Sequence, residues 1–279
     1  MKSPILLAAA VAFTPVPAAA QDLPDHSKFA AVLSAHLHNG LVDYAAIRAD
    51  RTGLDNYIDE LGSTSATAVN SAPRDRQLAF WINAYNACTM RLIVDHYPIE
   101  KRTGLGSIVN RVRGMPANSI RQIPATFAHE FCPVAGKQRS LDEIEHEIIR
   151  PMGEPRIHFA VNCAARSCPV LAAAPYTGEH LDEQLDAAVA KLVANPASYS
   201  LERERRPVVH LNKVLDWYKD DFGGEEGVLS FLLPYLPESD RKYIESNDGT
   251  RLEFEHYDWT LNDTAVFGTH QSPCLPLAS

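Results

Sequence analysis

The densest group of chemically reactive side chains lies between residues 156 and 169. It contains two cysteines, Cys163 and Cys168, and His158 and Asn162 precede them closely in the chain. A thiolate with an imidazole to hold its proton is the pair needed for acyl transfer. Two cysteines can instead form a disulfide in an exported protein, and a Cys-x4-Cys spacing also permits zinc binding. This stretch therefore offers three kinds of chemistry.

The element that would position these groups is a predicted strand over residues 156–163. The run is mostly apolar, follows Pro155 and ends in a loop of small residues. Because side chains alternate along a strand, His158 and Asn162 would share one face and Cys163 would lie on the other. Pro169 suits the first position of a helix, and a helix N-terminus lowers the pKa of a nearby thiol. We therefore predict Cys168 as the nucleophile and Cys163 as the more buried thiol.

A second histidine lies on a helix predicted just before this strand. Ser140 and Glu143 have the spacing of a capping box, so a helix should begin there and end before Pro151. It carries Glu145 and His146. His146 is thus an alternative base to His158, and Glu145 or Asp258 could orient whichever histidine acts.

The longest predicted helix runs over residues 73–97 and is apolar nearly all round, which indicates burial on most sides. Asn83 and Asn86 are three residues apart and so lie on one face of it. Two buried amides without partners would cost a few kcal/mol. They must bond to a neighbouring backbone segment, to the His158 strand or to a ligand, and with Asn162 they are candidate binding residues.

Other segments have the periodicity of secondary structure. Helices are predicted near residues 25–38, 54–61, 179–194, 227–233 and 238–245, a hairpin at 131–138, two strands within 200–211 and one at 252–256.

The first twenty residues have the parts of a secretory signal peptide: a basic start, an apolar run, and small residues before a cleavage site after Ala20. We predict a periplasmic or secreted protein whose residues 21–279 form a single domain. No other stretch approaches the roughly 20 apolar residues of a membrane span.

The amino-acid composition limits the classes of partner and ligand that the protein is expected to bind. A net charge of −9 argues against a nucleic-acid surface, which needs clustered Lys and Arg. Five cysteines leave at least one thiol without an intramolecular partner. No phosphate-binding glycine loop is present, and no second cysteine pair supports a zinc site. We predict a small-molecule or peptide substrate, no cofactor and no metal ligands; the sequence does not indicate the oligomeric state.

Five sequence blocks together resemble the domain of unknown function 547 family. They are FWINAYN at 80–86, LDEIEH at 141–146, RIHFAVNC at 156–163, SCP at 167–169 and YDWTLN at 257–262. The resemblance extends from about Phe29 to Asn262 and implies an exported bacterial protein with an α/β domain. The general plan is also similar to papain-like and transglutaminase-like cysteine enzymes, although no block has their Cys, His, Asp order. With the predicted elements, this gives an α/β (α+β) fold: a buried central helix packed on a small, largely antiparallel sheet with peripheral helices.

Two functions follow from these residues. The first is a cysteine-dependent hydrolase or acyltransferase with Cys168 as nucleophile, His158 or His146 as base, and Asn83, Asn86 and Asn162 as hydrogen-bond donors. The second is a non-catalytic ligand- or peptide-binding module in which Cys163 and Cys168 form a disulfide. Both place a pocket between the Asn83 helix and the His158 strand.

Overall fold

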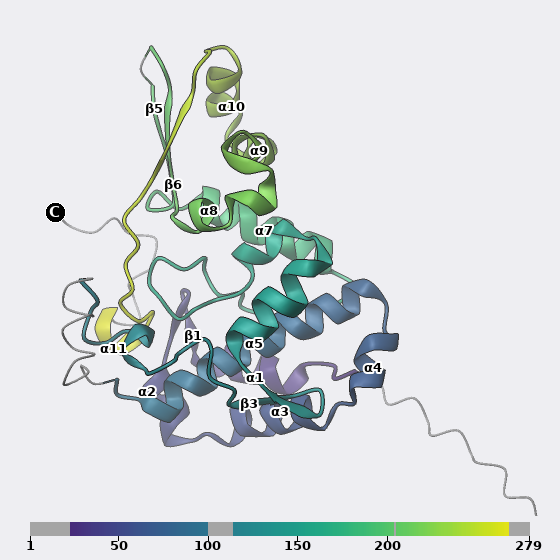
Figure 1. Ribbon diagram of the computed structural model, residues 1–279. Coiled ribbons are helices and arrows are strands. Elements are labelled where there is room, and N and C mark those ends of the chain that lie inside the picture. The colour runs from purple at the N-terminus through teal and green to yellow at the C-terminus, as the bar shows by residue number, and fades with distance from the viewer. Residues whose placement is uncertain (1–22, 100–113, 204, 268–279) are drawn as a thin grey trace, which may run out of the picture.

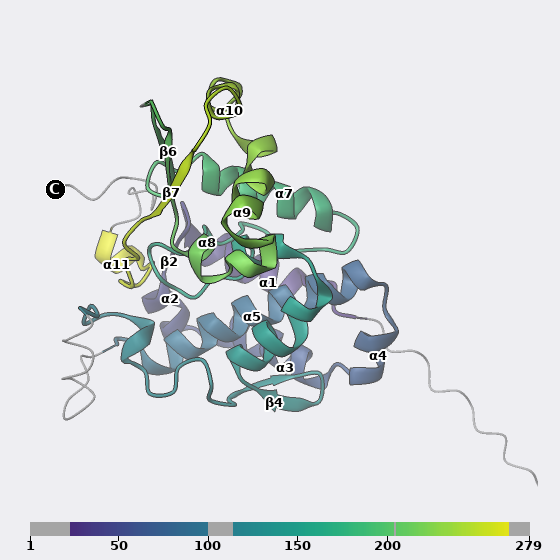
Figure 2. The same ribbon diagram turned by 45° about the horizontal axis from the view of Figure 1, so that its top comes forward.

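The computed structural model describes residues 23–99, 114–203 and 205–267. The predicted signal peptide and Cys274 lie outside these ranges. Figures 1 and 2 show two parts: helices gathered around α5 (Arg74–His96), and a smaller part built on a three-stranded sheet. Each part has its own hydrophobic cluster.

The central helix α5 confirms the longest predicted helix. It begins directly after Pro73 and ends before Pro98, because proline suits a helix start and the residue before a proline avoids helical geometry. Every residue from Leu78 to Met90 is buried, as expected for a helix that is apolar on all sides. α2 (Tyr44–Ala49), α3 (Thr52–Ser63) and α4 (Ala66–Ser71) pack against it, and α1 (Ser27–His36) packs against α2 and α3.

The predicted first helix is shorter than expected. α1 ends at His36 because Leu37–His38 (β1) pairs with Leu41–Val42 (β2). Asn39 and Gly40 form the turn with φ of 52° and 85°, which is the Asn-Gly chemistry of a tight hairpin.

The predicted hairpin and capped helix are confirmed. β3 (Cys132–Val134) pairs antiparallel with β4 (Lys137–Arg139), and a Cys88–Cys132 disulfide joins the hairpin to α5. The Ser140 hydroxyl then accepts a hydrogen bond from the Glu143 N–H at 3.0 Å. Beyond this cap the chain winds as the π-helix η2 (Glu143–Ile149), followed by the 3-10 helix η3 (Arg150–Met152).

The predicted strand at 156–163 is wrong. Residues Pro155–Phe159 form a 3-10 helix, η4, and an irregular segment follows it. Proline at the first helical position and the Glu154 carboxylate, which accepts the Arg156 N–H at 3.1 Å, both start a helix locally. A short apolar run fits strand and helix equally well, and here the local start signals decide. His158 and Asn162 therefore do not share a strand face.

The α+β class is confirmed, with sheets that are small and antiparallel or mixed. In the larger sheet β5 (Tyr199–Glu202) pairs antiparallel with β6 (Val208–Leu211), and β6 pairs parallel with β7 (Arg251–Phe254). α5 meets the β3–β4 hairpin rather than this sheet. The other predicted helices appear as α7 (Leu181–Val193), α9 (Gly224–Leu232) and α10 (Glu238–Glu245), with α8 (Val214–Trp217) and the 3-10 helix η5 (Lys219–Phe222) between β6 and α9.

Among the described helices, none is both long enough and apolar enough to span a membrane.

Candidate functional site

The two buried asparagines of α5, Asn83 and Asn86, hydrogen-bond to backbone groups of neighbouring segments. Asn83 donates to the Tyr176 carbonyl at 2.7 Å and accepts the Tyr176 N–H at 2.9 Å. Asn86 donates to the Ala160 carbonyl at 3.0 Å and accepts the Asn162 N–H at 2.8 Å. Each amide thus pairs with backbone on both its donor and its acceptor side. Asn86 fixes the segment that leads directly into Cys163.

The loop between the cysteines is closed by hydrogen bonds within it. The Asn162 amide accepts the Ala164 N–H at 2.8 Å and donates to the Pro169 carbonyl at 2.9 Å. Ala164 has a φ of 59°, and the Cys168 N–H donates to the Ala165 carbonyl at 3.0 Å. These contacts bend the chain so that its two cysteines meet.

The segment after β7 brings a distant part of the chain to this loop. Ser167 accepts the Asp258 N–H on its hydroxyl at 2.9 Å, and its own N–H donates to the Asp258 carbonyl at 3.2 Å. The Asp258 carboxylate accepts the Thr260 N–H at 2.9 Å. Asp258 therefore shapes the segment, and its neighbour Tyr257 is placed against the sulfurs.

The two sulfurs lie 2.9 Å apart without a bond between them. The Tyr257 hydroxyl is 3.1 Å from the Cys163 sulfur, and the Cys163 N–H donates to the Cys168 sulfur at 2.9 Å. The Cys168 thiol, followed by the Tyr257 hydroxyl, donates to Cys163 and lowers its pKa, although burial opposes this. Burial, followed by the same bond to Cys163, raises the pKa of Cys168. Of the two sulfurs, Cys163 is therefore the one more favoured as thiolate.

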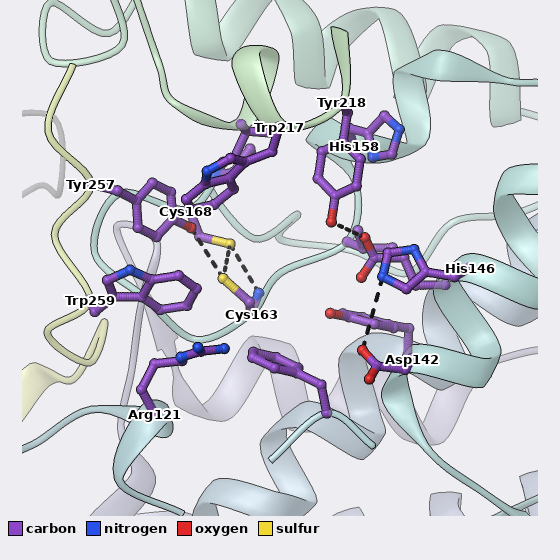
Figure 3. Close-up of a pocket in the computed structure, with 16 residues that line it drawn as sticks. Arg121, Asp142, His146, His158, Cys163, Cys168, Trp217, Tyr218, Tyr257 and Trp259 are labelled. Atoms are coloured by element: carbon purple, nitrogen blue, oxygen red, sulfur yellow. Dashed lines mark hydrogen bonds and ion pairs between the residues drawn. The ribbon is translucent and has the colours of Figure 1, made fainter. Parts of the chain in front are cut away.

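Both sulfurs lie at a cavity of about 380 Å³ (Figure 3). One side of the cavity is aromatic: the ring centroids of Trp217 and Tyr257 are 4.6 Å apart, and those of Tyr257 and Trp259 are 4.7 Å apart. The Arg121 guanidinium lies 5.1 Å from the Trp259 ring centroid. Trp217 is 45% exposed, so this wall reaches the protein surface.

The opposite side of the cavity is polar. The Tyr218 hydroxyl donates to the Glu145 carboxylate at 2.5 Å, and Glu145 is buried. His146 is partly exposed, with its Nε2 3.9 Å from the Asp142 carboxylate. In Figure 3 His146 lies across the cavity from the two sulfurs.

His158 lies behind Tyr218. The two rings stack with centroids 3.8 Å apart, and His158 Nε2 donates to Asp221 at 2.7 Å. Arg150 also holds Asp221, at 2.7 and 2.8 Å. Burial lowers the pKa of His158 to about 4 despite Asp221, so the ring is neutral at pH 7. Its Nδ1 is buried and, within the described residues, has no hydrogen-bond partner.

The structure brings five predicted site residues to one cavity, namely Cys163, Cys168, Glu145, His146 and His158. Asn83, Asn86, Asn162 and Asp258 lie outside its lining and bond to backbone; a role for them in ligand binding stays a prediction. In the described part of the chain no histidine hydrogen-bonds to either sulfur.

Two arguments about the cysteines are corrected. No helix begins at Pro169, where the chain is irregular, so Cys168 lacks the helix terminus expected to lower its pKa. Cys163 was expected to be buried away from the site, but both thiols are partly exposed and both line the cavity, because the segment is not a strand with two opposite faces. Cys168 as nucleophile stays a prediction, whereas the pKa directions of the two thiols favour Cys163.

The position of the aromatic wall and of Tyr218 at the cavity was not predicted from the sequence. The mixture of aromatic and acidic residues at 215–223 and the YDWTLN block were visible signals, but nothing local relates them to the cysteines. In the described ranges no group of three or more His, Cys, Asp or Glu side chains is arranged to hold a metal ion.

Residues 69–193 match the model of a family described as a protein of unknown function, DUF547. The matched segment includes α5, Cys163, Cys168, Glu145, His146 and His158. The match is narrower than the resemblance expected over residues 29–262: the aromatic wall from Trp217 to Trp259 lies outside it. No curated protein and no solved structure matches the chain.

Proposed function

We propose that this protein is a cysteine-dependent hydrolase or acyltransferase whose nucleophile is the thiolate of Cys163. The observation that carries the proposal is the placement of the Cys163 sulfur at a 380 Å³ cavity with two hydrogen-bond donors, the Cys168 thiol and the Tyr257 hydroxyl. A thiolate stabilised in this way and open to a cavity is the species that attacks acyl groups.

In the proposed reaction the Cys163 thiolate attacks a carbonyl carbon. The resulting oxyanion collapses, a thioester forms on Cys163, and the leaving group departs with a proton from the opposite wall. Water or a second nucleophile then gives a proton back to that wall and attacks the thioester. The acyl product is released as the C–S bond breaks, and Cys163 returns to its thiolate form. The scheme needs a proton carrier within hydrogen-bond reach of the leaving group.

His146 suits the role of proton carrier better than His158. His146 lies across the cavity and is partly exposed, so it can exchange protons with solvent. His158 is buried, and its Nε2 is engaged by Asp221. Glu145 and Tyr218, joined by their hydrogen bond, stand beside His146 and provide a second path for the proton.

The substrate in this proposal is a small molecule or peptide with an acyl group. An aromatic wall of two tryptophans and a tyrosine favours a flat or apolar portion of the substrate. Arg121 on one side and Asp142 and Glu145 on the other allow polar ends of opposite sign. Both features match a peptide segment at least as well as a purely apolar ligand.

The test is acylation by 4-nitrophenyl acetate, read out by nitrophenolate release and by peptide mass spectrometry. We expect one acetyl group on Cys163, loss of that adduct in Cys163→Ala, and a slower but retained reaction in the matched variant Cys168→Ala. His146→Ala should leave acylation in place and slow the turnover that follows. Acylation that is equal in wild type and Cys163→Ala would overturn the proposal.

A non-catalytic binding module is the second candidate, and the aromatic wall favours it. Three stacked or tilted rings around a surface-reaching cavity can hold a ligand without any reaction. In that case Cys163 and Cys168 would be found disulfide-linked in peptide maps made without reductant. Saturable quenching of Trp217 fluorescence by a peptide, unchanged in Cys163→Ala and without turnover, would favour this candidate.

Export is part of the same proposal. Cys88 and Cys132 are both buried and bonded to each other, and stable disulfides belong to oxidising compartments. We expect the chain in a periplasmic fraction to begin at Gln21. Recovery of the unprocessed chain from the cytoplasm alone would contradict export.

A further inference from the structure

We propose that Cys163 and Cys168 form a redox dithiol that exchanges with disulfides, which gives the cavity a thiol–disulfide oxidoreductase activity. This inference does not depend on acyl transfer. It follows from the relation between the two sulfurs, whereas acyl transfer needs Cys163 alone.

The two sulfurs lie close enough to bond with little movement of the chain. At 2.9 Å the two sulfurs are closer than a non-bonded contact, and they need to approach by less than about 1 Å to reach the 2.05 Å of a disulfide. The intervening loop is held on both sides, by Asn86 at Asn162 and by the Ala165 carbonyl at the Cys168 N–H. The fold therefore presents the pair ready for bond formation.

The two cysteine pairs of this chain differ in their exposure to solvent. Cys88 and Cys132 have no exposed surface, and their disulfide lies within the core. Cys163 and Cys168 are partly exposed and line a cavity that opens to solvent. A core disulfide is protected from exchange, whereas an accessible pair is the kind that reacts.

The pKa values of the two thiols are shifted in opposite directions. Cys163 is the sulfur favoured as thiolate, and Cys168 keeps the proton until its partner has reacted. The Tyr257 hydroxyl interacts with both sulfurs, so it can stabilise negative charge on either one during exchange. This division of roles is that of an attacking thiol and a resolving thiol.

The reaction balances as follows. The Cys163 thiolate attacks one sulfur of a substrate disulfide, R–S–S–R′, forms Cys163–S–S–R and releases R′–S⁻. The Cys168 thiol gives its proton to R′–S⁻, and the Cys168 sulfur then attacks the Cys163 sulfur and breaks its bond to R–S. The released R–S⁻ takes up a proton from solvent. This proton replaces the one that Cys163 lost to solvent when its thiolate formed. The substrate disulfide is reduced by two electrons, and the dithiol becomes the Cys163–Cys168 disulfide. An exported dithiol protein or small dithiol would reverse the change and complete a cycle.

The experiment uses the whole processed protein with its Cys88–Cys132 disulfide intact. The protein is equilibrated in glutathione buffers of increasing disulfide fraction, trapped with iodoacetamide and mapped by mass spectrometry. We expect the peptide containing Cys163 and Cys168 to convert reversibly between two alkylated thiols and one internal disulfide. The peptides containing Cys88 and Cys132 should stay linked throughout.

Two variants test the assigned roles. Cys168→Ser should accumulate a glutathione mixed disulfide on Cys163, because the resolving thiol is missing. Cys163→Ser should capture glutathione on Cys168 at least tenfold more slowly. Equal capture by the two variants would overturn the assignment.

A measurement on wild type keeps the test independent of variant folding. The equilibrium constant for forming the Cys163–Cys168 disulfide from glutathione disulfide should be at least tenfold larger in the native protein than in the urea-unfolded chain. An equal or smaller constant in the native protein would overturn the redox proposal. Acetylation of Cys163 by 4-nitrophenyl acetate in that same preparation would leave the acyl-transfer proposal standing, so the two can fail separately.

Discussion

Replacing Asn86 with alanine should destabilise the protein and impair Cys163 at the same time. The side chain holds the Ala160 carbonyl and the Asn162 N–H at 3.0 and 2.8 Å inside the core. Alanine would leave both backbone groups unpaired, and each such group costs about 1–3 kcal/mol. We therefore expect the free energy of unfolding to fall by about 3 kcal/mol, measured by urea denaturation followed by tryptophan fluorescence.

The second readout is the reactivity of Cys163. Asn162 precedes this residue directly, so a loosened segment should misalign the donors that stabilise the thiolate. We expect the iodoacetamide rate at Cys163, measured at pH 7 by peptide mass spectrometry under native conditions, to fall several-fold.

Asn83 provides the matched control because it lies on the same helix, is equally buried, and holds the Tyr176 backbone in the same two-bond manner. Asn83→Ala should cost a similar free energy of unfolding, about 3 kcal/mol, with much less effect on Cys163 alkylation. A loss below about 1 kcal/mol in Asn86→Ala would refute the clamp argument. Equal loss of alkylation in both variants would refute the link between the clamp and the thiol.

Three further predictions concern the thiol, the core disulfide and pH. Tyr257→Phe removes a donor from the Cys163 sulfur; because a hydrogen bond to a charged group contributes about 1.5 kcal/mol, the alkylation rate at neutral pH should fall by about tenfold. Reducing the Cys88–Cys132 disulfide, which closes a separation of 44 residues, should lower the free energy of unfolding by roughly 4 kcal/mol in urea denaturation with and without dithiothreitol. Burial lowers the pKa of both His26 and His158 to about 4, below the value near 6.5 of the unfolded chain, so protons bind the unfolded state first as pH falls. Stability should therefore be full above pH 7 and should decrease by about 2 kcal/mol for each histidine by pH 5, measured by urea denaturation at the two pH values.

Each of these three predictions would be contradicted by a specific result. An unchanged alkylation rate in Tyr257→Phe would show that the hydroxyl does not stabilise the thiolate. A urea midpoint insensitive to dithiothreitol, with reduction of Cys88 verified by mass, would contradict the disulfide's contribution. Stability that stays level from pH 7 to pH 5 would show that the two histidines are not held neutral in the native state.

Local signals in the sequence were sufficient for most elements of the fold. Pro73 and Pro98 bound α5, Ser140 begins η2, and the apolar periodicity of α7 and α10 is plain. Such signals act within a few residues, so the sequence alone contains them. The error at 156–163 has the same origin: a short, mostly apolar run fits two conformations, and Pro155 with Glu154 favours the helix.

The candidate site was predictable in part. The sequence identified the two cysteines, the two histidines and Glu145, because their residue types can do chemistry and they are close in the chain. It could not show which thiol is the more reactive, since that depends on donors and burial. Tyr257, which contacts Cys163, is 94 positions away, and Tyr218 lies 73 positions from the Glu145 that accepts its hydrogen bond.

By itself, the sequence determined the helical framework, the capped and proline-bounded ends of its elements, and the residue types available for chemistry at 145–168. Only the tertiary structure decided that Asn83 and Asn86 hold backbone, that Cys163 rather than Cys168 is favoured as thiolate, and that an aromatic wall from the C-terminal part faces them. The physical reason is range: helix starts and caps are set by neighbours in the chain, whereas pKa, burial and cavity shape are set by groups that meet only after folding.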